Sequence, residues 1–417
     1  MRIGLESKMD VLRPTTILLL AMVLISGTAA VGDDWPIYRG PNHNGFSNET
    51  DWKADWPAAG PKKLWTKSIG MGFSSITVAN GRAYMTGNSG QKKGAKDTIF
   101  CLDANTGKDI WTRSYDCPLE AKYYKGGTLA SPTVDGKVVY TISKMGHLFC
   151  LDAATGNVIW ARNANKDLGF KFPTWHFSGS PLVVGELLVF NLGTAGAALN
   201  KKTGQLVWDN GKDACGYATP VPCKINGQEC LVIAASESIV AVKPAGGKVL
   251  WKHPFVNKHK VSAADPIISG ANVFASCGYN RGCIMLDVTG NKPKELYDSS
   301  VVRNMRNHMN CSMLYKGNVY GFDENRLKCI SFKDGSEKWS EGSFGKGALM
   351  MSTDGRMIIM SDQGELAIAK ADPAGFKATA RAPILPKGLC WTVPVLANGK
   401  IYARNAQGDV VCVDVSG

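Results

Sequence analysis

The 417-residue sequence lacks several patterns that identify common classes of protein. It has no Ser-His-Asp constellation, no histidines at metal-ligand spacing and no glycine-rich phosphate loop, and it contains only six histidines. No recognised nucleic-acid-binding motif is present. The apolar run Ile17–Ile25 is too short to span a bilayer. These absences argue against a triad hydrolase, a histidine-rich metal site, a nucleic-acid-binding protein and a membrane-spanning protein.

Acidic residues are in the minority, with 35 Asp and Glu against 48 Lys and Arg. Without residues 1–30, which hold three basic and two acidic residues, 45 basic and 33 acidic residues remain, a net charge of about +12. This balance favours an anionic partner, such as a polysaccharide or the cell envelope. A well-solvated basic surface with no dedicated partner would give the same composition.

The first thirty residues have the layout of a Sec signal peptide. Lys8 and Arg13 precede the apolar run, and the small residues Gly27–Ala30 follow it. Met1 and Met9 are both candidate starts, and Met9 gives the more typical basic segment. Because no cysteine lies near the cleavage region, a lipid anchor is not indicated. We therefore expect a soluble, exported protein, periplasmic or extracellular, that begins near Val31 and is a monomer.

One pattern dominates the rest of the chain. The stretch Cys101–Trp111 predicts a strand, a Thr-Gly turn and a second strand that ends in Trp, and it returns almost unchanged at Cys150–Trp160. Weaker copies occupy 199–208, 242–251, 286–297 and 330–339, with a decayed copy around Gly375. Repeats at intervals of forty-odd residues indicate a repeat architecture.

A second repeated pattern is a strand pair joined by a glycine turn, often Asn-Gly or Asp-Gly. It occurs in eight places, 79–84, 134–140, 184–190, 225–231, 269–274, 315–320, 353–358 and 397–402. The strands of the Trp type also number eight, at Trp65, Trp111, Trp160, Trp208, Trp251, Tyr297, Trp339 and Thr379. Each unit therefore has four strands, and we predict an all-β, eight-bladed propeller of four-stranded antiparallel blades. We expect the six tryptophans to wedge between blades, which is a structural role.

The two ends of the chain complement each other. Trp65 stands in a strand with no repeat before it, whereas Val410–Gly417 is a repeat that stops at its turn. We therefore expect the Trp65 strand to complete the last blade and close the ring, which removes free sheet edges. The predicted organisation is a signal peptide at 1–30, an arm rich in Pro, Gly and Asn at 31–60, and a propeller at 61–417.

Twelve cysteines in an exported chain raise the question of disulfides. Four of them share one strand position in the repeat and are expected to be inert, buried thiols: Cys101, Cys150, Cys329 and Cys412. Two pairs are candidate disulfides: Cys223 with Cys230 across the Asn226-Gly227 turn, and Cys277 with Cys283, which flank the Tyr279–Gly282 turn. Cys223 and Cys230 fall on a hydrogen-bonded pair, where the Cα atoms lie farther apart.

Residues 99–111 and 148–160 match the Ala-x-Asp-x-x-Thr-Gly-x-x-x-Trp docking motif closely, with Cys in the place of Ala. Over roughly residues 60–417 the sequence therefore resembles the pyrroloquinoline-quinone (PQQ) type of β-propeller, and Trp35–Asn42 is similar to the start of exported bacterial members. The resemblance implies two branches. Quinoprotein dehydrogenases hold PQQ and calcium on the propeller axis, whereas BamB-like propellers are non-catalytic.

Several features of the dehydrogenase branch are missing. There is no adjacent Cys-Cys pair for a vicinal disulfide and no Cys-x-x-Cys-His haem site, and the chain lacks the large insertions of those enzymes. Two features also count against the BamB branch: the chain lacks a lipobox cysteine, and it carries an N-terminal Trp-Pro arm.

Ligands of propellers bind where the loops that enter the inner strands converge. Three long loops, 114–128, 163–179 and 298–311, and several shorter ones supply the candidates Lys122, Tyr123, Tyr124, Lys125, Lys171, Trp175, His176, Lys258, His259, Arg303, Arg306, His308, Lys346 and Trp391. Cations with Trp and Tyr suit a flat anionic ligand such as PQQ, or an acidic glycan. A solvated basic rim would have the same residues, and His176 could equally be packed against backbone.

A quinoprotein would also need carboxylates for calcium and a base for the alcohol proton. The acidic candidates near this face are Glu120, Asp213, Asp265 and Asp298. Asp265 precedes a proline where other blades carry Ser131, Ser180 and Thr219, so it is expected to point inward and is the acidic residue of choice for that enzyme. A hydrogen-bonded inner-strand residue is the alternative.

The sequence therefore favours an exported, non-catalytic binding or scaffold module for a protein, an anionic ligand or a glycan. The alternatives are a small PQQ- and calcium-dependent alcohol or sugar dehydrogenase, and a carbohydrate-binding propeller that uses Trp175, Trp391 and the tyrosines.

Overall fold

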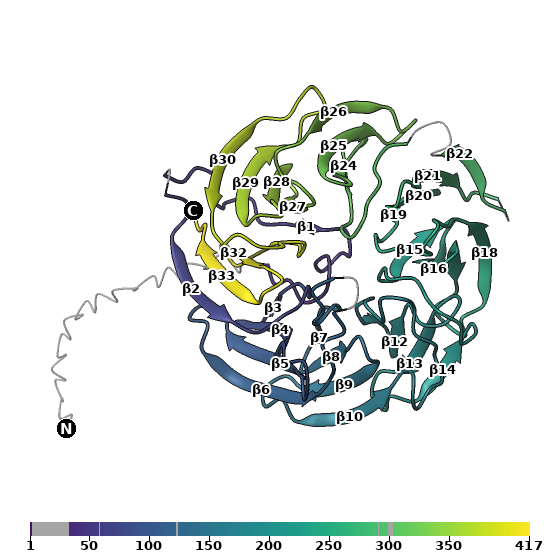
Figure 1. The fold of residues 1–417 in the computed structure, drawn as a ribbon, viewed down its shortest axis with the longest axis horizontal. Coiled ribbons are helices and arrows are strands. Elements are labelled where there is room, and N and C mark those ends of the chain that lie inside the picture. The colour runs from purple at the N-terminus through teal and green to yellow at the C-terminus, as the bar shows by residue number, and fades with distance from the viewer. Residues whose placement is uncertain (2–32, 58, 122–123, 291, 299–302) are drawn as a thin grey trace. The chain divides into compact units, whose positions relative to one another are not determined.

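The computed structural model describes residues 1, 33–57, 59–121, 124–290, 292–298 and 303–417, which leaves the predicted signal peptide outside the described residues apart from Met1. From Asp33 onward these residues form eight antiparallel sheets arranged as blades around a ring (Figure 1). The prediction of an all-β, eight-bladed propeller is confirmed. Each Trp-type strand is the outermost strand of its blade.

The first four blades consist of β3 (Thr77–Ala79), β4 (Arg82–Asn88), β5 (Lys96–Asp103) and β6 (Asp109–Asp116); β7 (Thr133–Asp135), β8 (Val138–Ile142), β9 (His147–Asp152) and β10 (Val158–Asn163); β11 (Leu182–Val184), β12 (Leu187–Phe190), β13 (Ala197–Asn200) and β14 (Leu206–Asp209); and β15 (Val221–Ile225), β16 (Gln228–Ala234), β17 (Ser238–Val242) and β18 (Val249–Pro254). We number the blades 1 to 8 in this order.

The remaining blades consist of β19 (Ile267–Ser269), β20 (Asn272–Cys277), β21 (Gly282–Asp287) and β22 (Lys294–Asp298); β23 (Met313–Tyr315), β24 (Asn318–Asp323), β25 (Arg326–Ser331) and β26 (Glu337–Glu341); β27 (Ala348–Ser352), β28 (Arg356–Met360), β29 (Glu365–Lys370) and β30 (Ala378–Pro383); and β31 (Val395–Ala397), β32 (Lys400–Arg404), β33 (Asp409–Asp414) and β2 (Lys63–Ser68). In blade 5 the two middle strands, β20 and β21, are the most buried, because both of their faces pack against neighbouring blades.

The ring closes as the sequence predicts. The strand β2 pairs antiparallel with β33, with Trp65 opposite Cys412, so the outermost strand of blade 8 comes from the N-terminal part of the chain. The Trp65 indole then reaches blade 1, where its Nε1–H donates to the Ala104 carbonyl at 3.0 Å. The two ends of the propeller are therefore held by backbone pairing within blade 8 and by Trp65 between blades 8 and 1.

Trp111 shows how a docked tryptophan contacts two features of the next blade. In blade 1, Trp111 Nε1 donates to the carbonyl of Ala153 in blade 2 at 3.0 Å, and the Tyr84 hydroxyl donates to the same oxygen at 3.4 Å. The indole ring lies over Gly156 of the Thr-Gly turn, where a Cβ atom would come within 2.6 Å of it. The repeated Gly therefore provides a positive φ and also leaves room for the neighbouring tryptophan.

Substitution of Gly156 by Ala is expected to lower the free energy of unfolding by about 2–4 kcal/mol, because it combines a left-handed backbone with overpacking against Trp111. Gly136 provides the control, since its φ is also positive, +60°, but a Cβ there would meet nothing within 4 Å. Gly136→Ala should therefore cost only about 1 kcal/mol. Urea denaturation of both variants measures the difference, and equal losses would contradict the docking role of Gly156.

The arm that precedes β2 crosses the inside of the ring. Trp35 pairs with Val78 of blade 1, the chain then reaches the axis at Tyr38, and β1 (Phe46–Ser47) adds a parallel fifth strand to β27 of blade 7. Beyond β1, both carboxylate oxygens of Glu49 accept backbone N–H groups of the Asn398-Gly399 turn in blade 8. The sequence predicted a structured arm but not this strand.

The thiols differ from the disulfide predictions. All twelve cysteines are free. Cys223 and Cys230 are opposite each other in register with sulfur atoms 3.1 Å apart, which is a contact between two thiols. The pairing of Cys277 with Cys283 is wrong, because Cys277 lies opposite Gly282 and Cys283 lies opposite Ser276. The one-residue offset turns the two side chains to opposite faces of the blade.

The four repeat cysteines are buried, as predicted. Cys101 lies directly between Tyr84 and Trp111 on the two neighbouring strands, and burial raises the pKa of its thiol to about 11. It is therefore a protonated, packed side chain at neutral pH.

Candidate functional site

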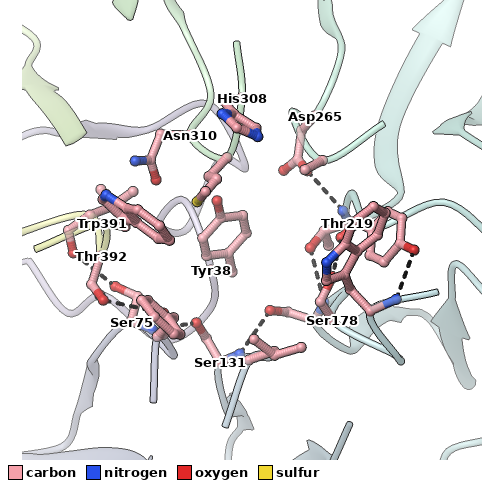
Figure 2. A pocket seen from close by; sticks show the side chains of 18 of the residues that line it. Tyr38, Ser75, Ser131, Ser178, Thr219, Asp265, His308, Asn310, Trp391 and Thr392 are labelled. Atoms are coloured by element: carbon pink, nitrogen blue, oxygen red, sulfur yellow. Dashed lines mark hydrogen bonds between the residues drawn. The ribbon is translucent and has the colours of Figure 1, made fainter. Parts of the chain in front are cut away.

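A pocket of about 330 Å³ lies on the propeller axis, where the loops that enter the inner strands meet. We call it the axial pocket. Figure 2 shows it from close by, with Tyr38 of the arm in the middle of a ring of side chains from the blades. The described residues that line it are Tyr38, Phe73, Ser75, Tyr124, Leu129, Ser131, Trp175, Ser178, Ser180, Tyr217, Thr219, Val261, Ala263, Asp265, Tyr279, His308, Met309, Asn310, Lys346, Trp391, Thr392 and Val393.

A chain of hydrogen bonds runs around the inner strands of the first six blades. At one equivalent position, a backbone N–H donates to the side chain of the next blade: Ser75 to Ser131 at 2.9 Å, Ser131 to Ser180 at 3.0 Å, Ser180 to Thr219 at 3.0 Å, Thr219 to Asp265 at 2.8 Å, and Asp265 to the Cys311 sulfur at 3.2 Å. Most of the polar side chains at the inner edge are therefore used to join one blade to the next.

Asp265 belongs to this chain, and its carboxylate has two different neighbours. Oδ1 accepts from the Thr219 backbone, as the hydroxyls do in other blades, and Oδ2 lies 3.9 Å from Arg39 Nη1 of the arm. Burial raises the pKa of Asp265 to about 6, and Arg39 opposes that shift. The inward orientation is confirmed, together with the alternative interpretation of a hydrogen-bonded inner-strand residue.

The raised pKa of Asp265 predicts a pH effect on stability. A carboxyl group whose folded pKa, about 6, exceeds the ordinary value of 3.8 binds its proton more tightly in the folded state. Its contribution to stability is therefore largest in acid and is lost as the pH rises through about 6. Relative to Asp265→Asn, the native protein should gain about 1 kcal/mol between pH 7.5 and pH 5. Urea denaturation at both pH values tests this, and a difference that does not change with pH would contradict it.

Aromatic rings form two walls of the axial pocket. On one side, Phe73 stacks on Trp391 with centroids 5.5 Å apart and contacts Tyr124 at 5.8 Å. On the other side, Trp175 stacks on Tyr279 at 6.3 Å and meets Tyr217 edge-on at 6.1 Å. The pocket therefore offers apolar flat surfaces to a ligand.

Three polar atoms of pocket residues are buried without a hydrogen-bond partner: Tyr124 Oη, His308 Nε2 and Trp391 Nε1. His308 Nδ1 lies 2.8 Å from the Lys346 ammonium, which can only donate, and 3.1 Å from Glu324 Oε2. If the ring carries its proton on Nε2, Nδ1 accepts from Lys346; if Nδ1 carries a proton, it donates to Glu324. The tautomer therefore decides whether the unpartnered His308 Nε2 donates or accepts, whereas the unpartnered Trp391 Nε1 is always a donor.

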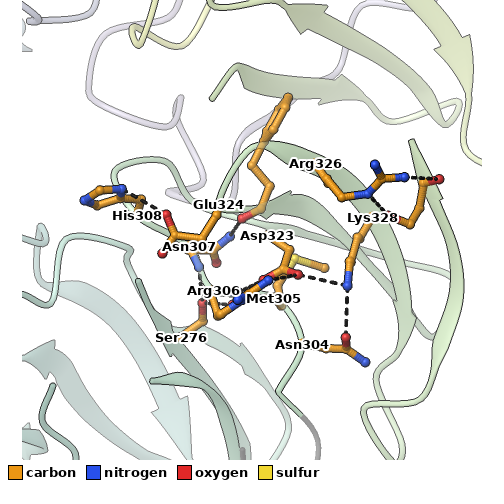
Figure 3. Close-up of polar contacts among 12 residues, drawn as sticks. Ser276, Asn304, Met305, Arg306, Asn307, His308, Asp323, Glu324, Arg326 and Lys328 are labelled. Atoms are coloured by element: carbon orange, nitrogen blue, oxygen red, sulfur yellow. Dashed lines mark hydrogen bonds and ion pairs between the residues drawn. The ribbon is translucent and has the colours of Figure 1, made fainter. Parts of the chain in front are cut away.

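Figure 3 shows how the 303–311 loop presents His308. Arg306 donates to Asp323 through Nε at 2.6 Å and Nη2 at 2.9 Å, and Lys328 Nζ lies 2.8 Å from Oδ2, which also accepts from Nη2. Glu324 accepts the Tyr279 backbone N–H and contacts His308, whose hydrogen bond is the main reason that the pKa of Glu324 falls to about 2. Arg306 therefore positions the loop and is not available to a ligand.

The structure brings six of the predicted site residues into the axial pocket: Tyr124, Trp175, Asp265, His308, Lys346 and Trp391. Lys122 and Tyr123 lie outside the described residues. His259 touches the rings of Trp175 and Tyr279 at the rim. The remaining candidates do not line the pocket: Lys125, Lys171, His176, Lys258, Arg303, Arg306, Glu120, Asp213 and Asp298.

Some of these excluded residues have clear local partners. His176 packs on Phe172, Lys171 pairs with Asp213 at 2.8 Å, and Asp298 pairs with Arg281 at 3.3 Å. The sequence analysis missed Tyr38, Phe73, Tyr217 and Tyr279 as lining residues. Tyr279 could have been predicted, because it is an aromatic residue directly beside the Asn280-Arg281 turn. Tyr38 offered none, because its position depends on how the arm crosses the ring.

The carboxylates of the axial pocket do not fit a calcium ion. Calcium takes six to eight oxygen ligands. Asp265 is the one carboxylate among the described lining residues; its Oδ1 accepts from the Thr219 backbone, and its Oδ2 lies 3.9 Å from Arg39 Nη1. Over the described part of the chain, no three His, Cys, Asp or Glu side chains gather in a group that could hold a metal ion. The arrangement therefore does not match a calcium-assisted quinone site.

An eight-bladed ring with tryptophans docked between blades and a pocket on its axis defines a propeller of the tryptophan-docking class. The chain belongs to the PQQ-like propeller family, since a family model described as outer membrane protein assembly factor BamB matches residues 49–214 and 95–341, more than half of the chain. A comparison with curated proteins gives no match. Within the described residues, no helix is long and apolar enough to cross a membrane.

Solved structures with the same fold come from both branches of the family. BamB from Moraxella catarrhalis superposes with a TM-score of 0.62 at 13% identity, over 85% of this chain and all of that one. The quinohemoprotein alcohol dehydrogenase ADHIIG from Pseudomonas putida HK5 gives a TM-score of 0.65 at 13% identity, over 92% of this chain and 80% of that one. The computationally designed protein Ika8 gives 0.56 at 13% identity. The TM-scores show a shared fold, and at identities this low they show the fold alone.

Proposed function

We propose that this chain is an exported, non-catalytic binding module whose axial pocket receives a ligand and whose surrounding face is open to a protein partner. The signal-like layout of residues 1–30 supports export. The description of the family as an assembly factor supports a scaffold role with a protein partner.

The observation that carries the proposal is the contrast within the axial pocket. Its walls are aromatic and polar atoms of Tyr124, His308 and Trp391 have no hydrogen-bond partner, so it is equipped to hold a ligand. Calcium-assisted catalysis is not provided for, because Asp265 is the one carboxylate among the described lining residues and a calcium ion takes six to eight oxygen ligands.

A sugar ring is the ligand class that a specific observation favours. Trp175 with Tyr279 and Trp391 with Phe73 present stacked pairs on two walls, and aromatic faces pack well against the C–H faces of pyranose rings. Trp391 Nε1–H can donate to a hydroxyl oxygen, and His308 Nε2 and the Tyr124 hydroxyl can each donate to or accept from a hydroxyl group.

A glycan array with the mature protein tests this ligand class. Trp175→Ala and Trp391→Ala should each weaken any glycan bound by the native protein by about tenfold or more, since a buried aromatic contact contributes more than 1 kcal/mol. Trp56→Ala is the matched control, because Trp56 is partly buried and does not line the pocket. No glycan binding, or equal loss in the control, would rule out the carbohydrate class.

A further inference from the structure

A second cavity, of about 370 Å³, lies between the arm and the inner strands of blades 4 and 5. We call it the arm cavity. Tyr38 lines the axial pocket and the next residue, Arg39, lines the arm cavity, so consecutive residues of the arm face two different spaces. A ligand in the arm cavity would therefore occupy a site separate from the axial pocket.

The polar lining of the arm cavity is basic. Arg39 and Lys224 contribute cations, and His43, Asn42 and Asn44 contribute polar groups from the arm. Burial and the charge of Arg39 lower the pKa of His43 to about 4, so this imidazole is neutral at pH 7. The described lining residues include no Asp or Glu. The cavity therefore presents positive charge without a carboxylate of its own.

Arg39 is buried with part of its hydrogen-bonding capacity unused. Arg39 is only 5% exposed. Nη2 donates to the carbonyls of Asn44 at 3.0 Å and Ser312 at 3.3 Å, but Nε and Nη1 have no hydrogen-bond partner. Asp265 Oδ2, 3.9 Å from Nη1, is beyond hydrogen-bond distance. A buried guanidinium with open N–H groups is costly, and an acceptor with negative charge would remove that cost.

We infer that the arm cavity binds a small ligand through an oxyanion group, a carboxylate or a phosphate, whose oxygens accept hydrogen bonds from Arg39 and face the Lys224 ammonium. Charge-assisted hydrogen bonds to an arginine are the strong class of such contacts. Lys224 is exposed at the cavity and attracts anions from solvent. The apolar side chains of Phe46, Ile267 and Leu314 in the same lining leave room for an organic remainder of the ligand.

Calorimetric titration of the mature protein at low ionic strength with inorganic phosphate, and separately with acetate, tests the inference. At least one probe should bind saturably, and the probe that binds tells a phosphate from a carboxylate ligand. Lys224→Glu should weaken binding by about tenfold, because it reverses a charge beside the anion. Lys108→Glu is the matched control, since it makes the same charge change on an exposed turn of blade 1 and should leave affinity unchanged.

Arg39→Gln should abolish binding if the variant folds; if it does not fold, Lys224→Glu decides the question. Saturable binding of neither anion, or equal weakening by Lys224→Glu and Lys108→Glu, would overturn the inference. Trp391→Ala should leave anion binding unchanged, so the result is independent of the function proposed for the axial pocket.

Discussion

Trp65→Ala should lower the free energy of unfolding by about 3–5 kcal/mol, the range for truncation of a buried tryptophan. Trp65 is buried, meets Tyr402 of its own blade at a tilted angle, packs on Gly107 of blade 1 and donates to the Ala104 carbonyl. It is the tryptophan that joins the last blade to the first. Its loss therefore weakens the contact that keeps the ring closed, in addition to leaving a cavity.

Trp339→Ala is the control for this prediction. Trp339 is only partly buried, and a Cβ at Gly375, the glycine of the decayed repeat in blade 7, would touch nothing within 4 Å. The same substitution there should cost clearly less than at Trp65. Guanidinium denaturation followed by circular dichroism measures both. Equal losses would show that docking onto the glycine turn contributes little to the stability of the ring.

The second large loss of stability is expected when a buried ion pair between blades 1 and 2 is broken. Lys144 Nζ lies 3.6 Å from Asp97 Oδ1, and both side chains are fully buried. Asn88 Nδ2 also donates to Asp97 Oδ1, at 2.6 Å, whereas Lys144 Nζ has no hydrogen-bond partner. Asp97→Asn keeps the shape and leaves Lys144 as a buried charge without a counter-charge, so the expected loss is about 3–5 kcal/mol.

The double variant Asp97→Asn with Lys144→Met provides the test of that mechanism. Removing both charges should restore most of the stability lost in Asp97→Asn, because the cost comes from the unpaired cation. Urea denaturation of the two single variants and the double variant gives the coupling free energy. Losses that simply add would contradict the account of the buried pair.

The fold was predictable because its long-range contacts are encoded by a short repeat. Trp111 contacts Ala153 and Gly156, which occupy fixed places in the next copy of the motif, so counting copies also counts the contacts between blades. The inward orientation of Asp265 followed in the same way from its place before a proline.

The rest depended on geometry that no repeat encodes. Tyr38 meets Cys311 across 273 residues of sequence, and its place under the axial pocket is set by the path of the arm. His176 and Arg306 lie in the predicted loops, but Phe172 and Asp323 hold them away from the pocket. The pairing of Cys277 with Cys283 failed because their spacing across the turn leaves the register offset by one residue.

The central claim, that the axial pocket binds a ligand without quinone chemistry, is tested most directly by titrating the mature protein with PQQ and calcium while following absorbance, melting temperature and alcohol-dependent dye reduction. We predict no calcium-dependent PQQ binding and no dye reduction, because Asp265 is the one carboxylate among the described lining residues and a calcium ion takes six to eight oxygen ligands. Saturable, calcium-dependent binding together with alcohol-dependent dye reduction would contradict the account.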